Sequence, residues 1–400
     1  MDVITTLKSR YLGRVPQAMR LILLGGGFLL LYRYHLMHYF PKPSQLEAAL
    51  VDQSKTWTTI TKNPLFGGYK ALAHLLAKLL HNPLEAARFT SALVALLTLG
   101  LFHYVLSIWH DKYIATLGVM LLGTSSWLLG IGRLGTVDIT YAFCITLALA
   151  YGAWSRVTRK RSLIIPVGAL CAVVFLYTPG MVWFLGLAAA WQYKFILAFG
   201  RRYPRRAIAG GFALVLLLMP LVYAGVRNPV VLGEMAGYQA HLLTAITKLP
   251  HRLVENFGHL FVSGQGNGAI GVAGLPLVDV FIAITTLLGL YAQWTFHRLD
   301  RARLTAGILV LGLALATISS VFSLAIVLPI LFLCATAGFD YLLRDWRTVF
   351  PRNPLARGVG LGLITLLVAI SCFYNLTKYF SAWPKTVEAR QAFGAVAEKP

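Results

Sequence analysis

The chain has 400 residues, of which 58% are hydrophobic and only 12% are charged, and its mean hydropathy is +0.69. This composition excludes an ordinary soluble domain and indicates an integral membrane protein. The formal net charge of +22 could by itself suggest a nucleic-acid partner. However, the basic residues stand in short clusters between apolar runs, so we interpret them as topology signals and expect no nucleic-acid binding.

Apolar runs of about 20 residues recur along most of the chain, which is the length that a helix needs to cross a ~30 Å hydrocarbon core. These runs lack strand-type alternation, so the predicted fold class is all-α: a polytopic membrane helical bundle in a single transmembrane domain over residues 1–400. The four cysteines fall inside predicted spans and indicate neither disulfides nor a cysteine metal site; they are Cys144, Cys171, Cys334 and Cys372.

The basic clusters predict the orientation, because loops rich in Lys and Arg stay cytoplasmic. The clusters are Lys8 to Arg20, Arg156 to Arg161, Arg201 to Arg206, Arg298 to Arg303 and Arg344 to Arg357. An even number of spans must separate each cluster from the next. We therefore predict about 11 spans, with the N-terminus cytoplasmic and the C-terminus extracytoplasmic. We expect the protein in the cell membrane. The predicted spans cover residues 21–40, 85–108, 113–131, 138–155, 162–199 (two spans), 207–226, 275–296, 304–341 (two spans) and 358–379.

Three segments are then expected outside the membrane: a first outer loop over 41–84, a long outer loop over 227–274 and a short tail over 380–400. Within the first loop, two lysines of the segment Pro64–His81 would cost about 5 to 7 kcal/mol at the bilayer centre, so this segment is not a span. Its basic residues share one helical face opposite an apolar face, which predicts an amphipathic helix in the outer interface. We interpret the basic stripe as an anchor to anionic lipid; it consists of Lys70, His74, Lys78 and His81.

The outer segments hold carboxylates and cations at one membrane face, where a lipid-linked phosphate would lie. The candidate acidic residues are Glu47, Asp52 and Asp138, and the candidate cations are Arg88, Arg133, Lys62 and Arg252. A phosphate leaving group needs cations to stabilise its developing charge. An acceptor hydroxyl needs a base, and one positioned carboxylate contributes about 10²- to 10⁴-fold in rate.

Each acidic candidate has a structural alternative. Glu47 follows Ser44 by three residues and can form a capping box with it. Asp52 can be a solvated interfacial charge, and Asp138 can cap the helix that it begins, together with Thr136.

The cations have structural alternatives too. Arg88 can simply extend its charge to the membrane interface, and Arg133 can pair with Asp138 across a short loop. His35 and His38 have a spacing that could bind a metal, but two interfacial histidines seldom do. No metal site is predicted, and a metal requirement stays open.

At these positions the chain resembles the dolichyl-phosphate-mannose protein mannosyltransferase-like glycosyltransferases, which are GT-C fold enzymes of glycosyltransferase family 39 and its aminoarabinose-transferase relatives. The resemblance covers residues 20 to 155 and, more loosely, 270 to 340. The motifs that carry it are Glu47 in the first outer loop, Asn63-Pro64-Leu65, Ala86-Ala87-Arg88-Phe89, Gly132-Arg133, Asp138 and Pro276-Leu277-Val278-Asp279.

The resemblance implies a GT-C-like fold, with the catalytic carboxylate of the first loop falling on Glu47 and a second acidic position on Asp138. The chain departs from the family pattern at two places. Leu46 precedes Glu47 where the family shows an Asp-Glu pair, so Asp52 remains a rival base. Lys62 stands one place before the position of a common Lys-Pro step.

The predicted function is therefore transfer of a sugar, with inversion, from a polyprenyl-phosphate donor to an acceptor hydroxyl on a lipid, glycan or protein at the extracytoplasmic face. Arg88, Arg133, Lys62 and Arg252 would bind the donor, membrane lipids would be further partners, and no cofactor is predicted. The alternative is a multi-span transporter or flippase of a lipid-linked solute. Transporters tend to carry ionisable groups near the midplane, and the predicted spans carry almost none.

Overall fold

The computed structural model describes residues 17–34, 36–37, 40–237, 249–264, 270–272, 274–295, 300–318 and 323–394. Within these residues every regular element is helical, so the all-α prediction is confirmed. The helices are α2 (Gln17–Arg33), α3 (Gln45–Ser54), α4 (Trp57–Lys62), α5 (Gly67–Leu80), α6 (Pro83–Trp109), α7 (Lys112–Gly123), α8 (Ser126–Arg133), α9 (Asp138–Val157), η2 (Arg161–Leu163), α10 (Ile164–Leu176), α11 (Met181–Arg202), α12 (Pro204–Arg227), α13 (Pro229–Ala236), α15 (Leu249–Phe261), α16 (Val280–Thr295), α17 (Asp300–Ile318), η3 (Leu324–Ile326), α18 (Leu328–Val349), α19 (Pro354–Thr377), the π-helical turn η4 (Lys378–Ala382), η5 (Trp383–Lys385) and α20 (Val387–Ala392).

Six helices of the described residues are long and apolar enough to cross a membrane. The number rises to seven if α7 and α8, which meet at a 60° bend, form one broken span. Shorter apolar helices cover 22–33, 164–176 and 280–295. The chain is thus a helical membrane protein. The count of 11 spans goes beyond these findings and stays a prediction.

Asparagine followed by proline begins three of the helices. Asn82 accepts hydrogen bonds from the backbone N–H groups of Leu84 and Glu85 at 3.1 and 3.2 Å, at the start of α6. Asn228 and Asn353 cap α13 and α19 in the same way. The asparagine side chain satisfies N–H groups that have no partner inside the helix, and the proline that follows has no N–H to satisfy. These boundaries therefore follow from local sequence.

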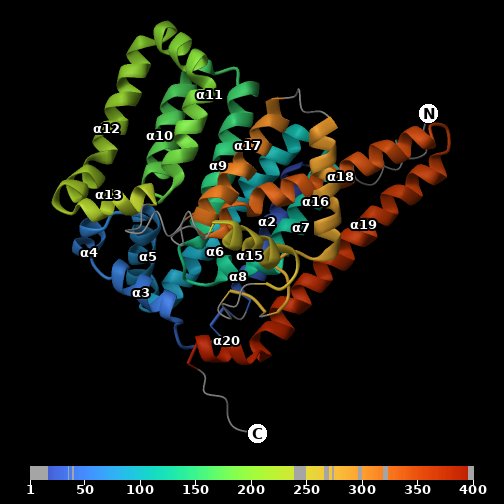
Figure 1. The fold of residues 1–400 in the computed structure, drawn as a ribbon, viewed down its shortest axis with the longest axis horizontal. Coiled ribbons are helices and arrows are strands. Elements are labelled where there is room, and N and C mark those ends of the chain that lie inside the picture. The colour runs from blue at the N-terminus through green and yellow to red at the C-terminus, as the bar shows by residue number, and fades with distance from the viewer. Residues whose placement is uncertain are drawn as a thin grey trace.

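The helix α18 lies at the centre of the bundle. In its most apolar stretch 83% of the residues are buried, against 11% in α11 and 17% in α12. Figure 1 shows α9, α10, α11 and α12 grouped on one side of the bundle and α19 running along the opposite side. The weakly buried helices leave many large apolar side chains uncovered, as expected where lipid replaces protein as the neighbour.

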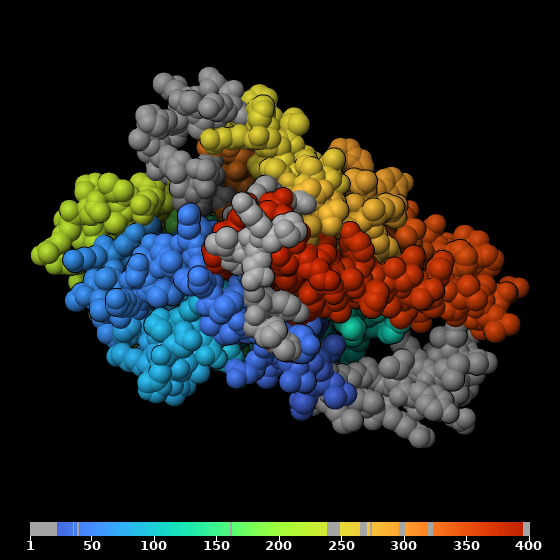
Figure 2. All heavy atoms as spheres, turned by 90° about the horizontal axis from the view of Figure 1, so that it is seen from below, coloured from blue at the N-terminus to red at the C-terminus, as the bar shows by residue number. Residues whose placement is uncertain are grey.

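The bundle has two ends of different character. Helices α3, α4, α5, α13 and α20 gather at one end, which we call the α5 end, and the turn between α11 and α12 lies at the other (Figure 1). This turn carries Arg201, Arg202, Arg205 and Arg206, so we call the second end the basic end. Figure 2 views the molecule from the α5 end, where the segment after α2 and the C-terminal residues lie side by side.

The interfacial helix predicted over Pro64–His81 is present as α5, but only half of its basic stripe faces outward: Lys78 and His81 are exposed, whereas Lys70 and His74 are buried. Lys70 and His74 are only 1% and 7% exposed. The Lys70 Nζ donates to the carbonyl of Asn63 at 3.1 Å, and the His74 Nδ1 lies 3.0 Å from the carbonyl of Ser54. The interpretation of these two residues as a lipid anchor is wrong, because both bind backbone carbonyl groups inside the protein. For Lys78 and His81 it stays a prediction.

The exposed face of α5 is largely apolar instead. Leu75 and Leu79 are 54% and 71% exposed, whereas Tyr69 is 5% exposed. A helix with this distribution can place leucines in the acyl region of a membrane while its polar residues hold the protein together. The helix is thus still suited to an interface, with leucines and the two basic residues Lys78 and His81 exposed together.

Glycines allow α16 and α18 to cross with their backbones in contact. A Cβ atom added at Gly289 would lie 1.8 Å from the Cys334 carbonyl oxygen, and one added at Gly338 would lie 1.9 Å from the Thr285 carbonyl oxygen. Small residues at such crossings permit close helix packing in membranes.

We expect Gly289→Ala and Gly338→Ala each to lower the free energy of unfolding by about 1 to 3 kcal/mol, because the backbones must separate. The control is Gly358→Ala in α19, where nothing lies within 4 Å of the new Cβ, and which should be neutral or stabilising by up to about 1 kcal/mol. Thermal unfolding of the three variants in detergent measures the difference. Equal melting temperatures for all three would contradict this packing.

Candidate functional site

A buried ion pair joins Glu47 of α3 to Arg88 of α6. The Arg88 Nε lies 2.7 Å from the Glu47 Oε1, and Nη2 lies 3.0 Å from Oε2. The side chains are 2% and 0% exposed. The Arg88 Nη1 also donates to the carbonyl of Phe40 at 2.7 Å. The alternative that Arg88 extends its charge to the interface is therefore wrong.

Glu47 has further donors on both carboxylate oxygens. The Ser44 N–H donates to Oε2 at 2.9 Å, and the two residues form the expected capping box at the start of α3. The Gly135 N–H donates to Oε1 at 3.0 Å. A carboxylate has about four acceptor sites, and these contacts occupy them. Burial would raise the pKa of the Glu47 carboxyl, but Arg88 and the backbone donors hold that pKa below its ordinary value of 4.5.

These contacts give Glu47 a structural role. It ties together α3, α6 and the loop that connects α8 to α9. A base must approach its substrate and accept a proton from it, whereas Glu47 is enclosed and holds its charge against protonation. The geometry thus disfavours Glu47 as the base.

Asp138 lies at the same end of the bundle as Glu47. It begins α9, three residues after the Gly135 that binds Glu47. Burial and the carboxylates of both Glu47 and Asp138 raise the pKa of Tyr69, whose hydroxyl lies 2.6 Å from the Ser91 Oγ. The tyrosine thus stands close to both acidic groups, so the expectation that they share one face is met.

The Asp138 carboxylate has fewer partners than that of Glu47. Ser323 and Thr136 approach it as hydrogen-bond donors, and the side chain is half-buried. Val137, and not Asp138, occupies the cap position of α9, and no side chain caps this helix. Asp138 therefore supports the helix start from the first turn and not from the cap position, and with fewer donors than Glu47 it is the better placed of the two to accept a proton.

Arg133, at the end of α8, is buried, and no carboxylate of the described residues forms an ion pair with it. It is 3% exposed, and its guanidinium lies over the rings of Tyr379 and Phe380, at 5.3 and 4.8 Å from their centroids. Only the carbonyl of Tyr34 accepts a hydrogen bond from it, through Nη2; Nε and Nη1 have no hydrogen-bond partner among the described residues. The expected pair with Asp138 is absent.

The Arg133 guanidinium lines a small pocket. Arg88 and Leu134 line it beside Arg133, and Tyr379 and Trp383 form an aromatic wall. Buried polar atoms in native proteins nearly always have partners, and an exception calls for a missing ligand or ion. The natural ligand for two N–H groups of a guanidinium is a carboxylate or phosphate.

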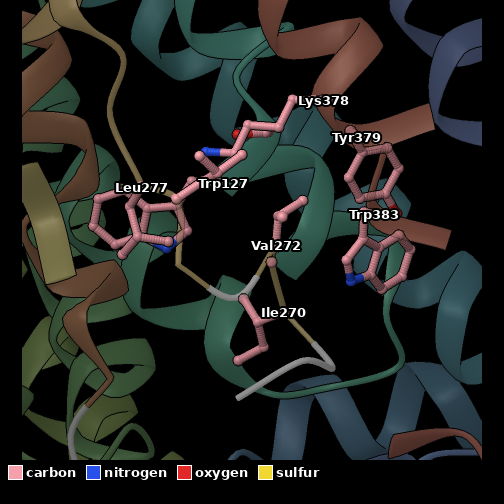
Figure 3. Close-up of a pocket in the computed structure, with 10 residues that line it drawn as sticks. Trp127, Ile270, Val272, Leu277, Lys378, Tyr379 and Trp383 are labelled. Atoms are coloured by element: carbon pink, nitrogen blue, oxygen red, sulfur yellow. The ribbon is translucent and has the colours of Figure 1, made fainter. Parts of the chain in front are cut away.

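A second, small pocket shares Tyr379 and Trp383 with the first. These two rings stack at 5.0 Å with an angle of 17° between their planes, and both pockets include them. Figure 3 shows Lys378 and Trp127 on one side of this second pocket and the stacked rings on the other. The two pockets together offer cations and flat aromatic faces.

Hydrogen bonds to the Asp279 carboxylate hold the surroundings of Lys378 in place. The Asp279 carboxylate caps α16 through the Ile282 N–H at 2.8 Å, and it accepts from Ser371 and from the Asn375 Nδ2, the latter at 2.6 Å. Lys378 is 6% exposed and donates to the carbonyl of Pro276. The Pro-x-x-Asp motif at 276–279 therefore braces the second pocket and gives α16 its N-terminus.

Five of the seven expected site residues line neither pocket. Glu47 reaches the Arg133 pocket only through its ion pair with Arg88, and Asp138 lies at the start of α9. The other three are Asp52, Lys62 and Arg252. Asp52 and Lys62 are exposed on α3 and α4, which agrees with the alternative of Asp52 as a solvated charge. Arg252 donates to the carbonyl of Ile318, at the end of α17, at 3.3 Å. None of the described contacts joins any of the three to Arg133.

Sequence reasoning missed the contribution of the C-terminal segment. Residues 380–400 were expected to form a short outer tail, but Trp383 and Phe393 pack against Phe40 at ring-centroid distances of 5.1 and 4.2 Å. The signal in the sequence was the density of aromatic residues directly after the last span, Tyr379-Phe380 and Trp383. Such residues prefer membrane interfaces, which made a packed turn plausible.

No group of three or more His, Cys, Asp or Glu side chains that could hold a metal occurs among the residues that the structure describes. The spaced pair His35 and His38 lies outside those residues. Comparisons with protein-family models, with curated proteins and with solved structures find no match for this chain.

Proposed function

We propose that this chain is a membrane glycosyltransferase that moves a sugar from a polyprenyl-phosphate donor to an acceptor hydroxyl at the extracytoplasmic face. The observation that carries the proposal is the buried guanidinium of Arg133 in an aromatic-lined pocket. Its Nε and Nη1 have no hydrogen-bond partner among the described residues. A charge buried without a partner costs several kcal/mol. A phosphate that enters the pocket would remove this cost and would gain charge-assisted hydrogen bonds.

The proposed topology has 11 crossings in a GT-C-like arrangement. It takes the six long apolar helices, the bent pair α7 and α8 as one crossing, and the shorter helices α2, α9, α10 and α16. The α5 end is then extracytoplasmic and the basic end cytoplasmic, because Arg and Lys clusters stay inside. The acyl chain of the donor would enter from the membrane, as its phosphate reaches the pocket.

In the proposed mechanism Arg133 binds the donor phosphate and Lys378 adds positive charge nearby. The stacked faces of Tyr379 and Trp383 provide flat apolar surfaces for the sugar. Asp138 takes the proton from the acceptor hydroxyl, whose oxygen forms a new bond to the anomeric carbon. The bond from that carbon to the phosphate oxygen breaks, and the polyprenyl phosphate leaves with the electron pair. Attack opposite the leaving group inverts the anomeric centre.

Mass spectrometry of lipid that co-purifies with the protein is the direct test. The proposal expects a polyprenyl phosphate, free or glycosylated, and formation of a glycosylated acceptor when the loaded donor is added to purified protein. Flux of a lipid-linked solute in proteoliposomes without any glycosyl product would replace this proposal with the transporter alternative. Absence of both a polyprenyl lipid and a product would contradict the transferase directly.

Arg133→Met is expected to separate function from stability. The variant should weaken binding of polyprenyl phosphate by about 10- to 100-fold, because two charge-assisted hydrogen bonds are lost. Its free energy of unfolding should stay level or rise, since an apolar side chain replaces an unpaired buried charge. Binding is measured by titration in detergent and stability by thermal unfolding.

The matched control is Arg227→Met. Arg227 also lies over an aromatic ring, that of Tyr223 at 4.8 Å, but it is exposed and lines neither pocket. This variant should leave phosphate binding unchanged. Lower stability of Arg133→Met together with undiminished binding would show that Arg133 is a packing residue.

A further inference from the structure

A third pocket, open to the surface, lies where α6 ends against α16, α17 and α18. Each of the last three helices contributes an alanine to its wall, namely Ala292, Ala302 and Ala337. Small side chains on three facing helices leave space that larger ones would fill. The pocket is therefore a consequence of the residue types at this crossing.

The polar lining of this pocket is mainly cationic. Arg301 and Arg344 line it together with Asp340 and His110. The Asp340 Oδ2 lies 2.7 Å from the His110 Nδ1 and 2.8 Å from the Arg344 Nη2. His110 and Asp340 are each 8% exposed, whereas Arg344 is 59% exposed, so the acidic group lies deep and Arg344 lies at the mouth.

The two arginines retain most of their hydrogen-bonding capacity. A guanidinium has five N–H donors. The Arg301 Nη1 donates to the carbonyl of Trp109 at 3.4 Å, and the Arg344 Nη2 bonds Asp340. The described structure assigns no further partner to either guanidinium. Two arginines face one carboxylate, which leaves an excess of positive charge.

The pocket lies at the opposite end of the bundle from Arg133. Arg88 is in the second turn of α6, and His110 directly follows the last turn of that helix. The 22 residues between them correspond to roughly 33 Å of helix at 1.5 Å per residue, close to the ~30 Å of a hydrocarbon core. Trp109 and Tyr341 also line the pocket, and both residue types favour the membrane interface.

We propose that this pocket binds a phosphate group, with Arg301 and Arg344 as its ligands. Basic pockets between helices at a membrane interface suit phospholipid headgroups, and guanidinium groups match the geometry of phosphate oxygens. Asp340 positions Arg344 at the mouth of the pocket. The site is separate from the proposed sugar-transfer site and does not depend on that function. Its phosphate can come from an anionic phospholipid or from a soluble phosphate compound.

The test compares binding from both sources to the full-length protein. One arm measures retention of phosphatidylglycerol by native mass spectrometry after reconstitution in nanodiscs of phosphatidylcholine and phosphatidylglycerol. The other measures binding of inorganic pyrophosphate to protein in phosphatidylcholine nanodiscs alone. The double variant R301Q/R344Q should weaken binding at least about 10-fold in the arm that supplies the natural ligand.

Two further variants separate a pocket from general charge and from misfolding. R347Q/R352Q removes the same number of charges near the same end, from exposed positions that do not line the pocket, and should leave binding unchanged. Ala337→Leu fills the pocket without a change of charge and should weaken binding while the protein still unfolds cooperatively. Loss in the lipid arm identifies a headgroup site, and loss in the pyrophosphate arm identifies a soluble ligand. Equal binding by wild type and R301Q/R344Q in both arms, or equal weakening by R347Q/R352Q, overturns the proposal.

Discussion

Asp138→Asn is expected to lower the rate of sugar transfer by about 10²- to 10⁴-fold, the usual contribution of a positioned general base. Asparagine has nearly the same shape as aspartate and can still bond Ser323, but it cannot take a proton from an acceptor hydroxyl. The loss should fall on kcat, with little change in KM for the donor, because Arg133 still binds the phosphate. Rates are measured with purified protein and a polyprenyl-phosphate sugar.

Asp52→Asn serves as the control for this prediction. Asp52 is exposed on α3, so its neutralisation should leave transfer unchanged. Full activity of Asp138→Asn together with an inactive Asp52→Asn would move the base to the rival position. Full activity of both would leave the proposed mechanism without a base.

Arg88→Leu is expected to lower the free energy of unfolding by about 3 to 5 kcal/mol, which is the usual cost of removing one partner from a buried ion pair. Glu47 would keep its bonds from Ser44 and Gly135 but would remain as a buried charge without a counter-ion. Glu47→Leu should cost a similar amount, since it strands the guanidinium of Arg88. Thermal and denaturant unfolding in detergent provide the measurement.

The double variant Glu47→Leu/Arg88→Leu gives the diagnostic result. An apolar pair of similar volume often matches a buried ion pair in stability, so the double variant should be more stable than either single variant. The two effects are therefore non-additive. Additive losses would show that the two charges contribute independently, contrary to the geometry.

Acidification should weaken the ion pair between Glu47 and Arg88. The pKa of Glu47 is lower in the folded protein than its ordinary value of 4.5, so the unfolded chain binds the proton more readily. The contribution of the pair is then fully present above about pH 4.5 and is lost as the pH falls through the lower folded pKa. The stability of Glu47→Leu/Arg88→Leu should lack this component, which acid titration of unfolding would detect.

Local features of the fold were accessible from the sequence. The capping box of Ser44 and Glu47 was an explicit alternative, and the start of α9 at Asp138 agrees with the expected span. Such features depend on residues a few positions apart, which the chain order already brings together. The all-helical membrane class likewise follows from the length and composition of apolar runs.

Contacts between distant residues were not accessible in the same way. Glu47 and Arg88 were assigned to separate roles, as base and as phosphate ligand, yet they bind each other over 41 positions of sequence. Lys70 and His74 were placed on an outward face because helical periodicity shows which residues share a face and not which way that face points. Neighbouring carbonyl groups, whose position only the packed chain defines, decided the direction.

The sequence by itself determined a helical membrane protein and the residues with which its helices begin, because apolar length and capping are local properties of the chain. Only the tertiary structure decided which charges are neutralised. It pairs Glu47 with Arg88 and leaves Arg133 unpaired against the rings of Tyr379 and Phe380. The physical reason is that the state of a buried charge depends on the groups packed around it, and these come from helices far apart in the chain.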